Sequence, residues 1–423
     1  LLTLRQKKYS ASLLLLMFIV SMIELLSLAL FLPVIQLASN ISDFKNNQLL
    51  FKVYQYLDLN SPKTYLGILL ATLLICYILK NVSLIAATYL QTKYAMSISM
   101  SLSERVLKTY QDMSWLNFQS HKEGDVMYDI YSRAQQVITS GVLSYIFLIY
   151  EVLVISMIII SIAIYNWLCL LLLITLILPM ITILYFCLRK YITKNTLDLT
   201  KFSPQLHSRM SQCINGYVDS KLANADDFFL ESFNVINRKI CAINTKGILY
   251  SQSPSRIIET GAILAIVLLT VYTSFINTSG NFTSLIAIFG IASFRLMPSI
   301  GRVMEALSGI KRSSVLILKY EDLFSNTNKS CTVSQKQKIS FNELSLKQIY
   351  FSYNSNAHVL HDLNLNIQKG EKIGFIGESG SGKSTLTNIL LGFIKPTHGT
   401  LVINGSTLHE DFSVQDWQST LGY

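Results

Sequence analysis

The segment FIGESGSGKST, residues 375–385, has residue types and a spacing that suit the binding of phosphate groups. Residues 377–384 fit the pattern G-x-x-x-x-G-K-[ST]. The glycines let the backbone curl so that consecutive N–H groups face inward and bind an anion. Lys383 can reach the outer phosphates of a nucleotide, and the hydroxyl of Ser384 can ligate Mg²⁺. The alternative is a glycine-rich turn, which the complete motif disfavours.

The elements on either side of the motif are those that a phosphate-binding loop requires. We expect a strand over residues 372–376 and an apolar helix over 385–391, whose N-terminus adds its positive end to the site. The sequence therefore predicts a nucleotide-binding loop with Mg²⁺. The candidate contacts are Gly377, Glu378, Ser379, Gly380, Ser381, Gly382, Lys383, Ser384 and Thr385.

The composition indicates a membrane protein. Of the 423 residues, 51% are hydrophobic and only 14% are charged. Soluble globular proteins carry about 25% charged residues, so lipid must accept much of the apolar surface of this chain. The six cysteines show no CxxC pair and no metal-ligand spacing, which disfavours a disulfide framework or a zinc site.

Six apolar segments are each near the roughly 20 residues that a membrane-spanning helix needs. They are residues 13–38, 65–90, 141–165, 167–188, 257–276 and 282–300. Residues 189–256 hold ten Lys and Arg against five Asp and Glu, whereas residues 166 and 277–281 hold no charge. Because cytoplasmic loops are rich in Lys and Arg, we expect the basic segment and both chain ends to be cytoplasmic. The formal net charge of +10 then reflects membrane topology, and we expect no nucleic-acid partner.

The chain changes character after residue 300. Residues 91–140 and 189–256 carry apolar residues at helical spacing, so we expect spans that continue beyond the bilayer. The external segment 46–59 has one apolar helical face, which predicts a helix on the membrane surface or on the ends of the spans. We predict an α-helical six-span transmembrane domain over 1–310, a polar linker over 311–339 and an incomplete α/β P-loop domain over 340–423.

Residues 340–423 resemble the start of the nucleotide-binding domain of ATP-binding-cassette (ABC) transporters. The resemblance lies in IYFSYNSNAHVLHDLNLNIQKGEKIGFIGESGSGKSTL and HGTLVINGSTL. It implies that ATP and Mg²⁺ bind at the P-loop and that Tyr353 stacks on the adenine ring, although a lone Tyr in a strand is more often a core residue. The family's glutamine loop, signature motif, acidic catalytic motif and switch histidine would lie downstream of Tyr423. We therefore expect a truncated domain with no complete catalytic set, inactive alone, within an intact protein that hydrolyses ATP.

The first part of the chain also resembles the exporters of this family. WLNFQSHKEGDVMYDI, residues 115–130, is similar to their first intracellular loop, with Gly124 at the family's glycine. GYVDSKLANADDF, residues 216–228, is similar to the second, with Lys221 at the family's lysine. The resemblance implies short coupling helices that rest on the nucleotide-binding domain, and a homodimer whose two P-loops enclose ATP.

Three cations within or beside the spans are candidates for a substrate cavity: Lys80, Arg256 and Arg295. Charges in a bilayer are costly and are functional candidates by default. Here they would suit a phosphate or pyrophosphate headgroup. The alternative is that each extends to the interface or pairs with a glutamate of the spans: Glu24, Glu151 or Glu259.

Two segments resemble bacterial lipid-linked oligosaccharide flippases of the protein N-glycosylation type: residues 21–44, SMIELLSLALFLPVIQLASNISDF, and residues 294–303, FRLMPSIGRV. This resemblance implies an ATP-driven flippase of the bacterial inner membrane, in contact with membrane lipids, that moves a lipid-linked oligosaccharide or a related amphipathic anionic lipid. Lys80 is a departure from this resemblance, because an arginine at this position would contact a phosphate through two hydrogen bonds. The alternatives are a multidrug or lipid exporter with an apolar cavity, and a nucleotide-binding membrane scaffold that transports nothing.

Overall fold

A computed structural model describes residues 4–31, 33–34, 62–165, 167–276, 282–325, 340–353, 359–408, 410–411 and 413–422. The chain forms two compact units. Unit 1 comprises Leu1–Leu107 and Glu123–Phe324, and unit 2 comprises Lys108–Lys122 and Ser325–Tyr423. The segment 46–59, predicted to form an external helix, lies outside the described residues.

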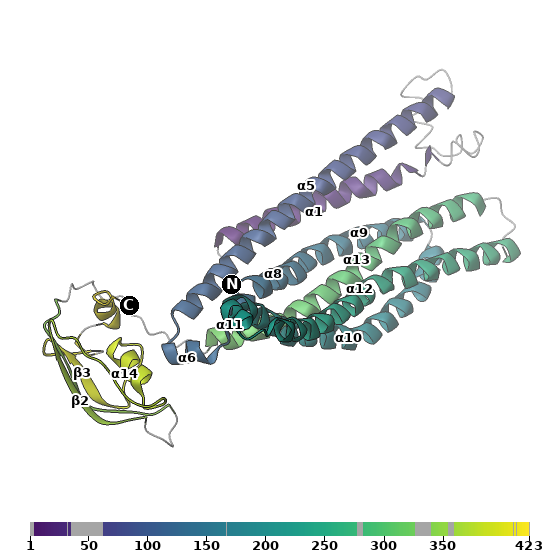
Figure 1. Cartoon of the computed structure of the whole chain (residues 1–423). Helices are drawn as coiled ribbons and strands as arrows, with labels where there is room; N and C mark the ends of the chain where they lie inside the picture. The colour runs from purple at the N-terminus through teal and green to yellow at the C-terminus, as the bar shows by residue number, and fades with distance from the viewer. Residues whose placement is uncertain are drawn as a thin grey trace. The chain divides into compact units, whose positions relative to one another are not determined.

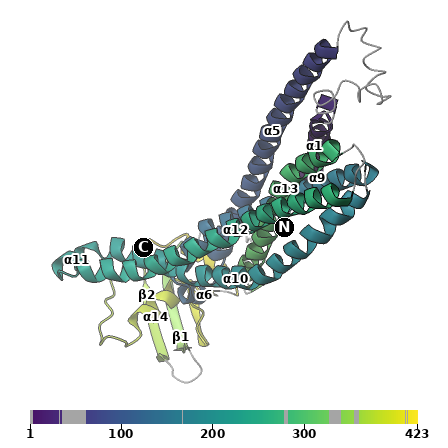
Figure 2. The same ribbon diagram turned by 90° about the vertical axis from the view of Figure 1, so that its right-hand side faces the viewer.

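Unit 1 is built from helices, several of which are long (Figure 1). They are α1 (Leu4–Ala29), α5 (Pro62–Gln111), α7 (Glu123–Met127), η1 (Tyr128–Arg133), α8 (Ala134–Val137), η2 (Ile138–Leu143), α9 (Ser144–Tyr165), α10 (Trp167–Asn215), α11 (Tyr217–Leu222), α12 (Asp226–Ile276) and α13 (Phe282–Ser325). The segments η1 and η2 are π-helical turns within the helical run from α7 to α9. Helices α10 and α12, of 49 and 51 residues, lie side by side in both views (Figures 1 and 2). At 1.5 Å per residue each is about 75 Å long, well over the ~30 Å of hydrocarbon.

Three helical runs in the described part of the chain are long and apolar enough to cross a membrane: Lys8–Ala29, Thr64–Gln111 and Glu123–Ile164. They contain the second and third predicted spans and much of the first. The other three predicted spans fall on α10, α12 and α13, where part of the side chains lies outside the described residues. The chain therefore has a helical domain of the membrane-spanning type.

The predicted linker over 311–339 is wrong for residues 311–325, because α13 continues to Ser325. Leu316, Tyr320 and Leu323 recur at helical spacing in this segment and are buried. Their apolar stripe holds the helix against unit 1. The polar residues between them, which face outward, produced the appearance of a linker in the sequence.

Glycines bring the helices of unit 1 unusually close together. A Cβ atom on Gly124 of α7 would lie 2.4 Å from the backbone nitrogen of Ser208 on α10. A Cβ atom on Gly309 of α13 would lie 2.1 Å from Oγ of Ser144 on α9. Both distances are far below van der Waals contact, so α7 packs on α10, and α13 on α9, at a separation that excludes a side chain.

Unit 2 contains a small antiparallel sheet with three short helices. Its strands are β1 (Glu343–Phe351), β2 (Leu360–Gln368), β3 (His398–Ile403) and β4 (Ser406–Thr407), in the order β2-β1-β3-β4. The helices are α6 (Trp115–Ser120), α14 (Lys383–Leu390) and α15 (Val414–Gln418). Leu346 and Ile349 of β1 pack against Leu386 and Ile389 of α14 in one buried cluster. The core of unit 2 thus fixes the start of α14 relative to the sheet.

The strand predicted over 372–376 is wrong in the described structure. No described strand pairs with this segment, and Ile376 is 99% exposed. An extended segment becomes a β-strand only when its backbone groups bond to a neighbouring strand. The sequence pattern identified the apolar residues but contains no information on the neighbour.

Candidate functional site

The predicted P-loop precedes α14, and its glycines adopt a conformation that other residues avoid. Gly380 and Gly382 have φ angles of 88° and 87°, and Gly382 is the N-cap of α14. A Cβ atom on Gly382 would also lie 3.0 Å from a methyl group of Leu360. Both requirements select glycine. The turn places Lys383 and Ser384 in the first turn of the helix.

Lys383 folds back over the loop. Its Nζ donates hydrogen bonds to the carbonyl oxygens of Gly377 (2.8 Å) and Glu378 (2.6 Å) and lies 3.3 Å from Oγ of Ser381. The ammonium group therefore lies beside the loop and the N-terminus of α14, the two features that attract anions. The Ser384 side chain is exposed in the same turn. The arrangement fits the phosphates of a nucleotide and, through the Ser384 hydroxyl, Mg²⁺.

Tyr353 lies close to this loop. Its hydroxyl is 3.0 Å from Oγ1 of Thr385, and its ring packs edge-to-face on Phe351 at a centroid distance of 4.9 Å. The side chain is 49% exposed, so Tyr353 is not a core residue. The structure brings it to the P-loop, where an exposed aromatic ring is available to stack on a base.

Helix α6 belongs to the same compact unit as the P-loop. The Trp115 ring stacks on Phe393 with centroids 5.0 Å apart and an interplanar angle of 23°. Trp115 also packs against the buried cluster of the sheet and α14. The sequence singled out this loop through Gly124 but did not identify Trp115. The sequence signal that could have identified Trp115 is an aromatic residue at the start of a short helix between two polar turns.

The second loop predicted from the sequence forms α11 and the start of α12. Lys221 donates to Asp226 at 2.5 Å, and Ser220 donates to the same carboxylate at 2.7 Å. The hydrogen bond from Lys221 holds the pKa of Asp226 below its usual value. The same bond raises the pKa of Lys221. Leu222 is 80% exposed. Lys221 therefore links the end of α11 to the start of α12 through an exposed ion pair.

Two of the three predicted cavity cations meet one carboxylate. We call Glu24, Lys80, Tyr150 and Arg295 the Glu24 cluster. Glu24 is 2% exposed, accepts a hydrogen bond from Tyr150 (2.7 Å), pairs with Arg295 (2.6 Å) and lies 3.9 Å from Nζ of Lys80. The cluster joins α1, α5, α9 and α13. Lys80 and Arg295 both pair with Glu24, a glutamate of the spans. This is the alternative that the sequence left open for these two cations.

The third predicted cation lies elsewhere. The side chain of Arg256 is 82% exposed and pairs with Glu259 one helical turn away, at 3.3 Å. The structure does not bring it to the Glu24 cluster. A further pair that the sequence did not identify joins Arg302 of α13 to the buried Glu151 of α9.

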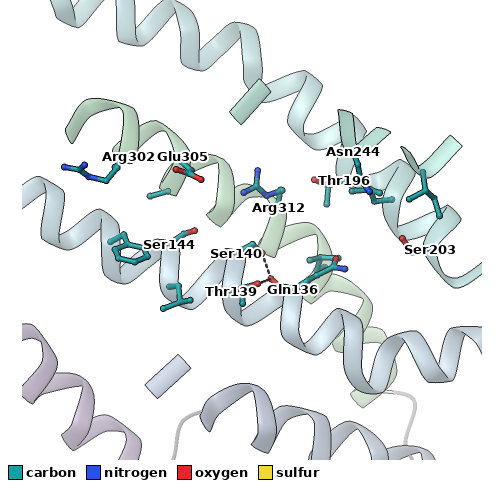
Figure 3. A pocket seen from close by; sticks show the side chains of 16 residues that line it. Gln136, Thr139, Ser140, Ser144, Thr196, Ser203, Asn244, Arg302, Glu305 and Arg312 are labelled. Carbon is teal, nitrogen blue, oxygen red and sulfur yellow. Dashed lines mark hydrogen bonds between the residues drawn. The ribbon is translucent and has the colours of Figure 1, made fainter. Parts of the chain in front are cut away.

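A cavity of about 600 Å³ lies in unit 1, between the segment formed by α8, η2 and α9 and helices α10, α12 and α13. Its polar lining includes Arg302, Glu305 and Arg312 of α13 and Gln136, Thr139, Ser140, Thr196 and Asn244 (Figure 3). Lys80, Arg256 and Arg295 do not line this cavity. Among the described residues, no group of three or more His, Cys, Asp or Glu side chains could hold a metal ion.

Comparisons with known proteins agree with this architecture. Residues 360–423 match the family model of the ABC transporter domain. The chain is 33% identical over 133 residues to a lacticin-481/lactococcin-DR transport/processing ATP-binding protein of Lactococcus lactis subsp. lactis, covering 31% of this chain and 19% of that one. It is 24% identical over 203 residues to a glutathione/L-cysteine transport system ATP-binding/permease protein of Bacillus subtilis, covering 47% and 35%. The matches thus span about a third or less of these curated relatives.

The fold has a solved counterpart. A bacterial Atm1-family ABC exporter with ATP bound is similar over 99% of this chain and 70% of its own, with a TM-score of 0.71 and 13% sequence identity. At this identity the likeness concerns the fold alone. The chain has the ABC exporter fold: a helical domain of the transmembrane type followed by part of a nucleotide-binding domain.

Proposed function

We propose that the chain belongs to an ATP-driven exporter of a bacterial inner membrane. One copy supplies six spans and a nucleotide-binding domain on the cytoplasmic side, and a second copy supplies the other half. The proposal is supported by the exporter fold, the match of residues 360–423 to the ABC transporter model and the geometry of the P-loop.

We assign each residue of the P-loop a role that its position supports. The backbone N–H groups of residues 377–385 and the ammonium group of Lys383 hold the phosphates, with Lys383 exchanging its bonds to the loop carbonyls for bonds to phosphate oxygens. The Ser384 hydroxyl holds Mg²⁺, and Tyr353 stacks on the base. Hydrolysis of bound Mg-ATP supplies the free energy for transport.

The observation that carries the proposal is the position of α6 in unit 2. The last residues of α5, which begins as a membrane-type helix, lead through Asp112–Ser114 into α6, and α6 is fixed to the phosphate-binding unit by the Trp115–Phe393 stack. A nucleotide-driven displacement of unit 2 must therefore pull on α5. The contact is the physical link that an ATP-driven transporter needs between hydrolysis and helix movement.

For the substrate we propose an amphipathic anionic lipid, such as a lipid-linked oligosaccharide. The Glu24 cluster places two cations on one carboxylate, which leaves a surplus positive charge among the spans. A lipid-borne phosphate or pyrophosphate is a suitable counter-ion. A multidrug or lipid exporter with an apolar cavity is the alternative. A peptide substrate is a second candidate, because one relative is named for lacticin-481/lactococcin-DR transport and processing.

The test is transport by the intact protein in liposomes, with ATP binding measured in parallel. Trp115→Ala should keep ATP binding and lose most ATP-driven movement of a short polyprenyl-pyrophosphate sugar, whereas Lys383→Ala should lose both. The matched control Phe118→Ala changes an exposed aromatic residue of the same helix and should change neither. Normal transport by Trp115→Ala would contradict the coupling role, and transport of peptides but not of the lipid would select the second candidate.

A further inference from the structure

The cavity of unit 1 contains an arginine without a bonding partner. In the described structure the guanidinium group of Arg312 makes no hydrogen bond and no ion pair, although Glu305 of the same helix lies near enough to raise its pKa. Burial, the larger effect, lowers that pKa, but a guanidinium group remains charged at neutral pH. Arg312 is therefore a half-buried cation that faces a cavity (Figure 3).

The position of Arg312 is held by close helix packing. The neighbouring Ser313 is buried and donates a hydrogen bond to the carbonyl of Val137 at 3.1 Å. A Cβ atom on Gly141 of η2 would lie 2.3 Å from Oγ of Ser313. α13 and η2 are thus fixed at this level, and Arg312 cannot retreat from the cavity by a shift of its helix. π-helical turns such as η2 are frequent at functional sites.

Three hydroxyl groups of the cavity are arranged as acceptors. Thr139, Ser140 and Thr196 each donate their proton to a helix carbonyl, at 2.8, 2.5 and 2.8 Å. A hydroxyl that donates to the backbone retains lone pairs that can accept a hydrogen bond from a ligand. The carboxylate of Glu305 is a further acceptor, and it lies two turns, about 10 Å along the axis, before Arg312. The lining thus offers a cation at one point and acceptors around it.

We propose that this cavity binds a phosphate-bearing polyol, with Arg312 as the counter-ion of the phosphate and Glu305 and the hydroxyl oxygens as acceptors for the polyol. The volume of about 600 Å³ is in the range of small-molecule sites. The polyol phosphate is either a soluble sugar phosphate or a lipid headgroup. The inference deepens the proposed function, on which it rests, by naming a substrate site distinct from Lys80, Arg256 and Arg295.

The site lies where a membrane-bound substrate would enter. It is lined by the start of the third predicted span and by α13 just beyond the sixth, at the end of the bundle that carries the basic segment 189–256. Arg302, one of the lining residues, follows the predicted end of the span at residue 300 by two residues, about 3 Å. Arg312 itself follows residue 300 by twelve residues, about 18 Å along α13, so a phosphate must extend beyond the bilayer surface to reach it.

The test measures binding to the protein in neutral phosphatidylcholine nanodiscs, in a Lys383→Ala background so that the P-loop does not take the phosphate. The probes are glucose 1-phosphate, pyrophosphate and glucose, with phosphatidylglycerol added to the nanodisc as the lipid arm. We expect glucose 1-phosphate or phosphatidylglycerol to bind, and Arg312→Gln to weaken that binding about tenfold or more. Arg312→Lys should retain part of it, and the control Lys319→Gln, an exposed cation of the same helix, should retain all.

A second variant separates the two halves of the site. Glu305→Gln should weaken binding of glucose 1-phosphate but not of pyrophosphate, because only the polyol donates to the carboxylate. Absence of binding by both polyol phosphates, or equal binding by Arg312→Gln, overturns the inference. Such a result leaves the exporter proposal intact if ATP-driven transport still depends on Lys383. Conversely, binding that depends on Arg312, without any ATP-driven transport, rejects the exporter proposal but supports the site.

Discussion

Neutralising Glu24 should destabilise unit 1 strongly. In Glu24→Gln the side chain keeps its size and can still bond to Tyr150, but Arg295 and Lys80 lose their counter-charge. The side chains of these cations are 13% and 10% exposed, so water cannot replace the carboxylate without rearrangement. Removing one partner of a buried ion pair costs about 3–5 kcal/mol.

The assay is thermal unfolding of the protein in detergent, together with a double-mutant cycle. A loss of that size should lower the midpoint by roughly 10 °C. Glu24→Gln combined with Arg295→Gln should be more stable than the sum of the single changes predicts, with a coupling energy of about 0.5–3 kcal/mol. Glu259→Gln is the matched control. It removes the partner of the exposed Arg256, and exposed pairs contribute only about 0–1 kcal/mol.

Three results would refute this reasoning. The first is an unchanged midpoint in Glu24→Gln, which would mean that the cations find other partners or water. The second is full additivity in the cycle, which would mean that Glu24 acts through packing or through Tyr150 rather than through Arg295. The third is an equal loss in Glu259→Gln, which would show that burial does not distinguish the two pairs.

Three further predictions concern other contacts. Gly124→Ala should destabilise the protein by about 1–3 kcal/mol in thermal unfolding, because its Cβ would meet the backbone of α10, whereas Gly67→Ala, where a Cβ meets no atom within 4 Å, should not. Lys383→Ala should weaken ATP binding at least about tenfold in a filter assay, because the loop loses its cation; unchanged affinity would reject the P-loop assignment. The pKa of Asp226 is lowered in the folded state, so its bond to Lys221 should protect the amides of α11 from hydrogen exchange at neutral pH. This protection should be lost as the pH falls below about 4, because Asp226 then becomes protonated. Asp226→Asn should remove this pH dependence.

The backbone conformation of the loop at residues 377–384 was predictable because its information is local, whereas the role of these residues in binding a nucleotide stays a prediction. Gly380, Gly382 and Lys383 act through backbone conformation and short reach, and both follow from residue type and spacing. The helical character of the long segments was predictable for the same reason. The strand at 372–376 was not confirmed, because a strand depends on a neighbour that spacing cannot specify.

The pairing of charges was beyond the sequence. Lys80 and Arg295 were identifiable as costly charges in apolar segments, but which glutamate each one meets depends on how α1, α5, α9 and α13 pack. Arg312 drew no attention because it stands in a polar stretch that resembled a linker. Its character as a cation without a bonding partner emerges only when α13 is seen to continue to Ser325 and to line the cavity.

The distribution of partners decides where an incoming anion meets the least competition. A phosphate that approached Arg295 would have to displace Glu24 at 2.6 Å and would strand a carboxylate that is 2% exposed. At Arg312 it displaces no bonded group, because the described structure gives this guanidinium no hydrogen bond or ion pair. Arg312 also follows the predicted end of the sixth span by twelve residues, and desolvating a charge costs less outside a span than in its middle. An anionic substrate should therefore engage Arg312 first, and reach Lys80 and Arg295 only after a rearrangement of the helices that separates them from Glu24.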